Sequence, residues 1–277
     1  MTDASLESAR ILLVGCGKMG GALLRGWLDR GLRPAHACVV EPARDALAWA
    51  VQAGVRCVDD RAAIPVAFRP DIVVFAVKPQ AMATVAPAYA DIVAGGAGAL
   101  SIAAGTRIAT FEGYFGADAP VLRAMPNTPA AIGHGMSVLV ANAAVDGPRR
   151  ALAEALMAAV GQVAWVDDEG LMDAVTAVSG SGPAYVFLLI ETLAAAGEAV
   201  GLAPALAAQL ARVTVAGAGA LAERAVEPAD QLRRNVTSPG GTTAAALGVL
   251  MRDGDGMAAL LREAVEAATR RGRELGG

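Results

Sequence analysis

The sequence predicts an α/β half followed by an all-helical half. Up to about residue 166, short apolar runs that end in turn residues alternate with stretches of helical period. From residue 167 onward, every apolar stretch has helical period, and no strand-like run lies between them. At 277 residues, 55% hydrophobic and 18% charged, the chain is long enough for two domains, predicted as 1–166 and 167–277, with a core in each.

In the first half, predicted strands and helices follow one another in turn. Residues 10–14 (RILLV) form a strand, and the helical stretch 21–31 (GALLRGWLDRG) stops at Gly31. A second strand at 37–42 (ACVVEP) precedes the helical 43–54. Further strands are VRCVDD (55–60), DIVVFAVKP (71–79) and ALSIAAGT (99–106). This alternation indicates right-handed βαβ units and a parallel sheet, so residues 1–166 are predicted to form a doubly wound domain.

The second half contains four long stretches of helical period, at 171–202, 204–225, 242–255 and 257–275. Small residues spaced along them let helix backbones approach closely. These helices are too apolar to be solvated on every remaining face. An oligomer interface explains this composition, and so does a tightly packed monomeric bundle.

Composition excludes several classes of function. A net charge of −4 argues against a nucleic-acid partner, because lysine and arginine dominate phosphate binding. Cys16, Cys38 and Cys57 are odd in number and show no C-x-x-C spacing, so neither disulfides nor a metal site is expected. We expect no signal peptide in the start, MTDASLESAR, and Glu191 and Glu198 interrupt the most apolar stretch. We expect a cytoplasmic protein with no membrane partner.

A glycine motif marks the end of the first strand. Gly15, Gly17 and Gly20 form G-x-G-x-x-G between a strand and a helix, which is the context that a dinucleotide fingerprint requires. Gly15 permits the tight turn, Gly17 lets a pyrophosphate approach the backbone, and Gly20 allows close packing of helix on strand. The loop also contains Cys16, Lys18 and Met19. The alternative is a tight turn without a ligand.

Polar side chains follow other strands at the same predicted edge of the sheet. Glu41 ends the second strand, where an acidic side chain can accept hydrogen bonds from adenosine ribose hydroxyls. Two further loops end on that edge and would line a cofactor crevice. One contains Ala76, Val77, Lys78 and Pro79, and the other runs from Ser101 to Thr106 and contains Ala103 and Ala104. The alternative for Glu41 and for Lys78 is a solvated charge at the strand end. In RAMPNTPAAIG, Asn127 and Thr128 could reach a nicotinamide or cap the turn.

The stretch NVTSPGGTTAAALGVL, residues 235–250, begins a helix in an unusual way. Gly240 and Gly241 lower helix propensity but leave their backbone N–H groups open to whatever approaches. An anion site at a helix N-terminus is built in this way. The alternative is a surface helix with Ser238 as its N-cap.

Five segments carry a resemblance to a known family: VGCGKMGGALLRG, AVKPQ, RAMPNTPA, DAVTAVSGSGPAYVF and NVTSPGGTTAAAL. In this order and spacing, they resemble pyrroline-5-carboxylate reductase, the enzyme of the last step of proline synthesis. The resemblance runs from Arg10 to about Glu274. It implies a Rossmann-like dinucleotide-binding domain, a helical dimerisation domain, hydride transfer from NAD(P)H to the cyclic imine, and intertwined dimers that often assemble into rings such as decamers.

The resemblance also assigns residues. Thr243 would place its hydroxyl against the imine nitrogen as the catalytic residue, and Asn235 matches an asparagine that reaches the cofactor from the partner subunit. The substrate carboxylate would bind the PGGTT turn, and Glu169 matches an acidic residue near the substrate. The implied substrate-binding set is Glu169, Ser238, Gly240, Gly241, Thr242 and Thr243.

Reduction of a C=N bond fits the small number of candidate catalytic side chains, because it needs an aligned hydride donor, a proton and little else. Glu41 would repel the 2′-phosphate of NADPH, so we expect NADH to be favoured, with Arg44 as the group that could rescue NADPH. Alternatives are a related imine reductase or β-hydroxyacid-type dehydrogenase, whose usual lysine or aspartate is missing near SGSGPAY, and a cofactor-binding regulator without activity.

Overall fold

The computed structural model describes residues 4–276, apart from the side chains of residues 4, 5, 44 and 46. Contacts divide the chain into two units. The first runs up to Gly180 and also includes the chain from Ala268 onward, and the second is Ser181–Ala267. Each unit is described by itself.

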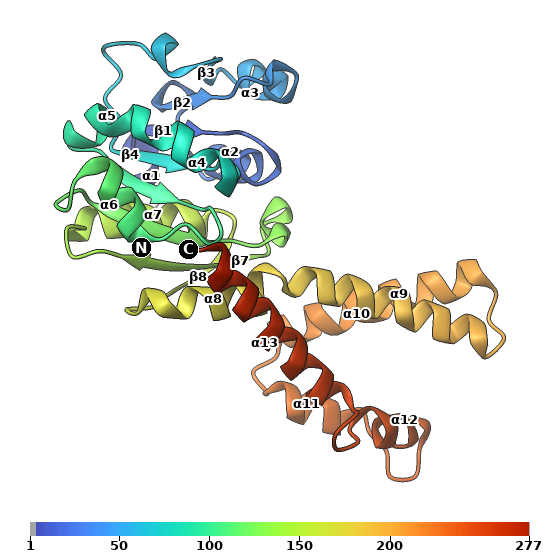
Figure 1. Cartoon of the computed structure of the whole chain (residues 1–277). Coiled ribbons are helices and arrows are strands. Elements are labelled where there is room, and N and C mark those ends of the chain that lie inside the picture. Colours follow the sequence, from blue (N-terminus) through green and yellow to red (C-terminus); the bar gives the residue numbers. More distant parts are fainter. Residues whose placement is uncertain (1–3, 277) are drawn as a thin grey trace. The chain divides into compact units, whose positions relative to one another are not determined.

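An eight-stranded sheet forms the centre of the first unit. Its strands are β1 (Ile11–Val14), β2 (Ala37–Val40), β3 (Arg56–Val58), β4 (Ile72–Phe75), β5 (Gly98–Ser101), β6 (Val121–Met125), β7 (Gly135–Ala141) and β8 (Gly161–Trp165). Their order is β3-β2-β1-β4-β5-β6-β7-β8, which can be followed downward through the sheet in Figure 1. The five strands predicted from the sequence are confirmed, and they pair in parallel.

The three strands β6 to β8 were not predicted. β6 continues the parallel sheet, but β7 pairs antiparallel with β6 and β8 then pairs parallel with β7. The prediction of a parallel sheet therefore holds for β1 to β6 only. Only the short segment with the 3₁₀ helix η5 (Thr128–Ile132) joins β6 to β7. A parallel return needs a crossover of a dozen or more residues, so this connection reverses the chain direction.

Helices cover both faces of the sheet. The α-helices of the first unit are α1 (Ala4–Ser8), α2 (Lys18–Asp29), α3 (Ala48–Gln52), α4 (Pro79–Val85), α5 (Ala90–Ala94), α6 (Ile108–Phe115), α7 (Gly147–Ala158) and α8 (Met172–Val175). Short turns are η1 (Pro34–His36), η2 (Arg44–Leu47), η3 (Arg61–Ala63), η4 (Ala86–Tyr89), η6 (Glu169–Leu171) and the π-helical η7 (Thr176–Gly180). The central strands β1, β2, β4 and β5 are buried on both faces, as expected for a doubly wound sheet.

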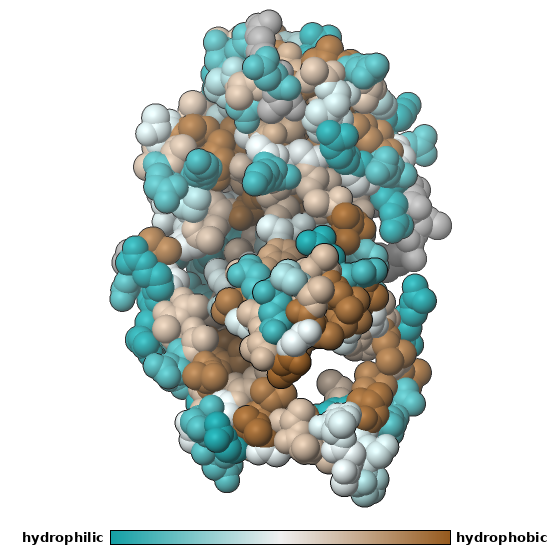
Figure 2. All heavy atoms as spheres, turned by 90° about the vertical axis from the view of Figure 1, so that its right-hand side faces the viewer, coloured by the Kyte–Doolittle hydropathy of each residue, from teal (hydrophilic) through white to brown (hydrophobic). Residues whose placement is uncertain are grey.

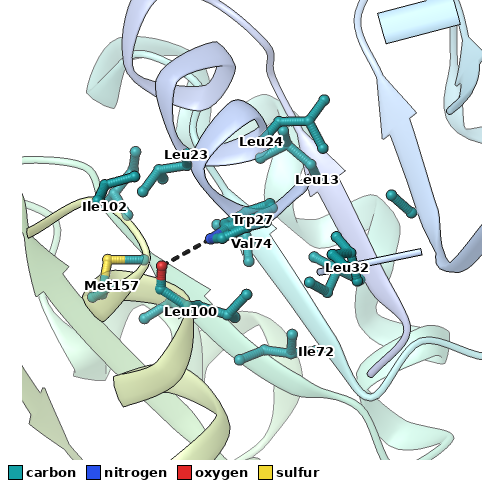
Figure 3. Close-up of a cluster of buried hydrophobic side chains, with 14 of the residues drawn as sticks. Leu13, Leu23, Leu24, Trp27, Leu32, Ile72, Val74, Leu100, Ile102 and Met157 are labelled. Carbon is teal, nitrogen blue, oxygen red and sulfur yellow. Dashed lines mark hydrogen bonds between the residues drawn. The ribbon is translucent and has the colours of Figure 1, made fainter. Parts of the chain in front are cut away.

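Alternation along each strand separates two cores. Leu13 of β1 and Val74 of β4 lie in one cluster with side chains of α2, α3 and α7. Leu12 and Val73, their neighbours in sequence, lie in the other with side chains of α4, α5 and α6. In the first cluster, the fully buried Trp27 donates its indole N–H to the Leu156 carbonyl at 2.8 Å, the dashed line in Figure 3. This bond satisfies the one polar group that the ring brings into the core.

The second unit is helical, as predicted. It contains α9 (Gly182–Ala199), α10 (Pro204–Arg224), α11 (Ala229–Asn235), α12 (Thr242–Leu250) and the first turns of α13 (Met257–Leu275). Helices α9 and α10 pack together, with Gly197 close against Ala207. Among the residues described here, only Ala207 and Ala211 are buried apolar side chains of this unit. Many large apolar side chains are exposed, and brown side chains show on the face drawn in Figure 2.

The division of contacts differs from the predicted boundary at 166/167. Residues up to Gly180 group with the sheet unit, because segments such as Met172 pack into its second core. The last ten residues also group there. The domain limits 1–166 and 167–277 therefore stay a prediction about function.

Two helical stretches, Glu169–Ala199 and Pro204–Arg224, are long and apolar enough to cross a membrane by length and composition. Such a pair is weak evidence for membrane spans, because helices with an apolar protein interface have the same composition. The expectation of no membrane partner remains a prediction.

Candidate active site

Four parallel strands end at the same level in the first unit. Val14 of β1 is in register with Val40 of β2 and Phe75 of β4, and Phe75 is in register with Ser101 of β5. The loops that follow these residues therefore meet at one carboxyl edge of the sheet. In open α/β sheets this edge holds the ligand, at the point where the strand order reverses between β1 and β4.

The glycine loop has the geometry that the sequence predicted for it. Gly15 has φ +92°, and a Cβ there would lie 2.9 Å from the backbone of Ala76 and Val77. A Cβ on Gly20 would lie 2.4 Å from the Gly15 carbonyl oxygen, so this glycine allows the close packing of α2 on the loop. Nothing lies within 4 Å of a Cβ built on Gly17.

Gly17 is also the N-cap of α2, and no side chain caps this helix. The N–H groups of its first turn, from Lys18 onward, are left for water or a ligand. A helix N-terminus with open N–H groups behind a glycine loop is a binding site for phosphate groups. The residues present thus fit a dinucleotide at this position.

Glu41 contacts the glycine loop directly. Its Oε2 accepts a hydrogen bond from the Cys16 N–H at 2.8 Å, and its Oε1 accepts one from the Ala43 N–H at 3.0 Å. A carboxylate has about four acceptor positions, so both oxygens can still accept from a ribose. Burial and the nearby Cys57 and Glu41 raise the pKa of the Cys16 thiol to about 11, so this cysteine stays protonated at neutral pH.

The two other predicted cofactor loops lie beside the glycine loop. Lys78 is the exposed N-cap of α4, whose first residue is Pro79. After β5, Ala103 is buried and donates its N–H to the Ser101 hydroxyl at 3.2 Å. Ala104 follows, half-buried. The structure thus brings together the sheet-unit residues predicted to hold cofactor: Gly15, Cys16, Gly17, Lys18, Met19, Gly20, Glu41, Ala76, Val77, Lys78, Pro79, Ala103 and Ala104.

Asn127 is engaged within the sheet unit. Its side-chain amide donates to the Ser179 carbonyl and hydroxyl, both at 3.3 Å, and its Oδ1 accepts from the Met136 N–H at 2.9 Å. The Asn127 side chain does not cap the turn η5, because it ties the start of β7 to the π-helical turn η7. Such π-helical turns are frequent at functional sites. The predicted reach of the turn η5 to a nicotinamide stays a prediction.

Glu169 lies at the start of η6, where it pairs with Arg123 of β6. Its Oε1 also accepts a hydrogen bond from the Ile108 N–H at 2.8 Å. Arg123 was not predicted as a site residue. The sequence could have indicated it, because an arginine inside the apolar run VLRAM needs an acidic partner when it is buried. The predicted contact between Glu169 and substrate stays a prediction.

The predicted substrate residues other than Glu169 lie in the second unit, around the start of α12. The N-cap is Gly241, with no side-chain cap, so the alternative in which Ser238 caps the helix is not what forms. Gly240 adopts φ +70°, which favours glycine. The Gly241 N–H donates to the Ser238 carbonyl at 3.1 Å and is therefore used internally. The N–H groups of Thr242 and Thr243 begin the uncapped first turn.

Asn235 ends α11 in the same unit and is exposed. Its Oδ1 accepts a hydrogen bond from the Gln231 side-chain amide at 2.7 Å. Its predicted role toward a cofactor held by another subunit stays a prediction.

Two family models match the chain. The model described as pyrroline-5-carboxylate reductase dimerisation matches residues 169–275, and the model described as NADP oxidoreductase, coenzyme F420-dependent, matches residues 10–105. The first includes α9 to α13 and the α12 N-terminus, and the second includes the glycine loop and most of the loop after β5. The dimerisation match agrees with the exposed apolar side chains of the second unit, and the chain forms homo-oligomers.

Curated relatives match over almost the whole chain. The chain is similar to pyrroline-5-carboxylate reductase of Pseudomonas aeruginosa, at 41% identity over 98% of each chain. It is also 41% identical to the enzyme of the same name from Synechocystis, over 97% of this chain and 99% of the relative.

Solved structures agree. The pyrroline-5-carboxylate reductase of Coxiella burnetii superimposes with a TM-score of 0.90 at 37% identity, over 98% of this chain and 99% of the other. The Plasmodium falciparum pyrroline carboxylate reductase, solved with NADP bound, gives 0.82 at 28% identity, over 98% and 99%. The glycine loop, the uncapped start of α12 and the similarity over almost the whole chain agree. The chain belongs to the pyrroline-5-carboxylate reductase family.

Proposed function

We propose that this protein reduces 1-pyrroline-5-carboxylate to L-proline with NAD(P)H. The observation that supports this most is the presence of two anion-binding helix starts in one chain. One follows the glycine loop and suits a pyrophosphate, and the other follows Pro239 and suits a carboxylate. A reductase that acts on a cyclic imino acid needs both.

In the first unit, the chain binds and orients the cofactor. The first turn of α2 donates N–H groups to the pyrophosphate, and the bare Gly17 lets it approach. The loops after β4 and β5 lie on the same sheet edge and would line the rest of the cofactor crevice. NAD(P)H, when bound, supplies the hydride that reaches the imine carbon.

In the second unit, the chain binds the substrate carboxylate. The N–H groups of Thr242 and Thr243 and the positive end of the α12 dipole favour a negative charge. Thr243 is half-buried, and its hydroxyl would donate to or accept from the imine nitrogen. A hydroxyl of ordinary pKa is a poor acid, so either water supplies the proton on nitrogen or the imine binds in its protonated form.

NADH is the favoured cofactor. The Glu41 carboxylate is held at the glycine loop by the Cys16 and Ala43 N–H groups. At a separation of about 4–5 Å, its repulsion of a 2′-phosphate is on the order of several kcal/mol before screening, and a fraction of this reverses a preference. The Arg44 side chain, which could offset this repulsion, lies outside the described residues.

The decisive experiment measures oxidation of NADH and of NADPH separately with 1-pyrroline-5-carboxylate. We expect turnover with both and a higher kcat/KM with NADH. Glu41→Ser should shift the ratio toward NADPH. Glu41→Gln is the matched variant, because its amide oxygen can still accept from the Cys16 N–H while the charge is gone. It should shift the ratio in the same direction. A wild-type preference for NADPH at physiological salt would show that Glu41 does not read the ribose.

The proposed site is built from two chains in at least a dimer, with Asn235 reaching the cofactor of the partner subunit, and decamers are one way for such dimers to assemble further. Location in the cytoplasm is part of the proposal and rests on three cysteines that are all free thiols. Light scattering of active enzyme at assay concentrations tests the assembly, and a monomer mass would contradict it.

A further inference from the structure

Arg123 is the one charged side chain that is buried among the described residues, with 5% of its surface exposed. It lies in β6, between apolar neighbours that fill the sheet. Its guanidinium donates to Oε1 of Glu169, whose side chain is itself only 28% exposed. Burying an arginine is costly unless it is paired, so this ion pair is a required feature of the fold around it.

The same carboxylate oxygen holds a third element. Oε1 of Glu169 accepts a hydrogen bond from the Ile108 N–H at 2.8 Å, and Ile108 is the first residue of α6. Its N–H has no partner inside that helix, and no side chain of the N-cap Arg107 provides one. A carboxylate at a helix N-terminus also interacts favourably with the helix dipole. One oxygen atom therefore joins β6, α6 and η6.

The joined point lies at the end of the loop after β5. Residues 102–107 run from the strand end at Ser101 to Ile108, and they include Ala103 and Ala104 of the proposed cofactor crevice. The chain near its C-terminal end contacts the same loop. A Cβ on Gly276 would lie 2.9 Å from the Gly105 carbonyl oxygen. The end of the loop is thus bonded to Glu169 through Ile108, and Gly105 packs closely against the last turn of α13.

The surroundings of Glu169 do not suit a substrate ligand. The cavity beside it measures about 50 Å³ and is lined by Gly105, Arg107, Arg123, Glu169, Gly170 and Asp173. Ordinary ligand pockets have roughly 300 Å³ or more. The proposed substrate carries a carboxylate, which a neighbouring glutamate would repel, and the charge of Glu169 is already matched by Arg123.

We propose that Arg123, acting through Glu169, is a positioning residue for cofactor binding: it fixes the loop 102–107 against the sheet edge, and Glu169 does not contact the substrate. This inference rests on the proposed function, since it takes that loop as a wall of the cofactor crevice. It replaces the role near the substrate that the family resemblance implies for Glu169.

The test separates cofactor binding from substrate binding. NADH is titrated into Arg123→Met and Glu169→Met by fluorescence without substrate, and KM is then measured for each substrate. We expect the Kd and KM for NADH to rise about tenfold in both variants, while KM for 1-pyrroline-5-carboxylate changes less than about twofold. The double variant should be no worse than either single one, because the two residues act as one unit.

Conservative variants guard against loss of folding. Glu169→Gln keeps an oxygen that can accept from Ile108 and Arg123, so its Kd for NADH should rise only about threefold or less. Arg123→Lys keeps the charge without the planar fork and should lie between Gln and Met variants in effect. If Arg123→Met does not fold, Glu169→Met tests the tenfold rise, and Arg123→Lys and Glu169→Gln test the graded smaller rises.

Arg149→Met is the matched control. Arg149 also pairs with an acid, Asp146, and donates to the Gly96 carbonyl, which precedes β5 at the opposite end of the strand. NADH binding should not change in this variant.

A rise in KM for 1-pyrroline-5-carboxylate with an unchanged Kd for NADH would overturn the inference and make Glu169 a substrate ligand. Unchanged values for both substrates would overturn it as well. Wild-type protein that binds NADH without reducing the imine would contradict the proposed function alone, because the binding titration needs no turnover. Wild-type protein that binds neither NADH nor NADPH would overturn both.

Discussion

The two units of this chain bury apolar side chains to very different extents. In the sheet unit, large side chains such as Trp27, Phe75 and Leu100 are fully buried. In the helical unit, two alanines are the only buried apolar side chains among the described residues, while Leu188 and Val213 leave 57% and 63% of their surface exposed. Both units are rich in apolar residues, so composition does not account for the difference.

The difference shows where each unit finds its stabilising contacts. Two helix layers on a sheet enclose two cores within one chain. The paired helices α9 and α10 enclose almost nothing by themselves, and exposed apolar patches of this kind mark interaction surfaces. The dimerisation match at residues 169–275 supports another copy of the chain as the partner of this surface.

The largest effect is expected from a charge on the exposed apolar surface of the helical unit. Leu188→Glu should break the oligomer and lower activity by about a hundredfold or more, because a charge buried without a partner is costly and the proposed site needs two chains. Light scattering and turnover measure this. Val66→Glu is the control, since Val66 is 86% exposed in the sheet unit, and it should leave both unchanged.

Shortening an apolar side chain should lower the free energy of unfolding in the sheet unit and weaken the oligomer in the helical unit. Leu100→Ala removes a fully buried side chain of β5 and should lower the free energy of unfolding by about 2–5 kcal/mol. It should not change the dilution at which the oligomer dissociates. Leu210→Ala in α10, where Leu210 is 47% exposed, should make the oligomer dissociate at a smaller dilution and change the free energy of unfolding of the sheet unit little. Equal effects of both variants on dissociation would contradict the comparison.

A smaller effect is expected at the start of α12. Thr243→Val should lower kcat/KM by roughly ten- to a hundredfold, or about 1.5–3 kcal/mol, because it removes a hydrogen bond that matters mainly in the transition state. Thr242→Val keeps the backbone N–H and loses a hydroxyl with no proposed role at the imine, so it should lower kcat/KM less than Thr243→Val does. Unchanged kinetics of Thr243→Val would exclude contact with the imine.

The smallest effect concerns alkaline pH, and it should arise in the sheet unit, where all three cysteines lie. Burial raises the pKa of Cys38 from 9.0 to about 11, so the folded state keeps a proton that the unfolded state loses. Stability from this group is complete below pH 9 and is lost as pH rises toward 11. Cys38→Ala should flatten the fall in urea midpoint across that interval. An unchanged slope would assign that fall to other groups.

Several features followed from the sequence by itself. The G-x-G-x-x-G loop, the acidic residue after the second strand and the apolar runs determined the nucleotide-binding half, because local backbone sterics and side-chain periodicity act over short distances. The same holds for the helices of the second half. The start of α12 was also located from the sequence, but only the structure decided that Ser238 does not cap it.

Only the tertiary structure decided which side chains meet across the chain. The reversal between β6 and β7 depends on how two strands pair, and GMSVLVA has no period that reveals its direction. Glu169 was predicted from the sequence as a substrate residue, and only the fold places it against Arg123 and Ile108, 46 and 61 residues away. Ion pairs of this separation form because a buried charge needs a partner, and the fold alone determines which partner is within reach.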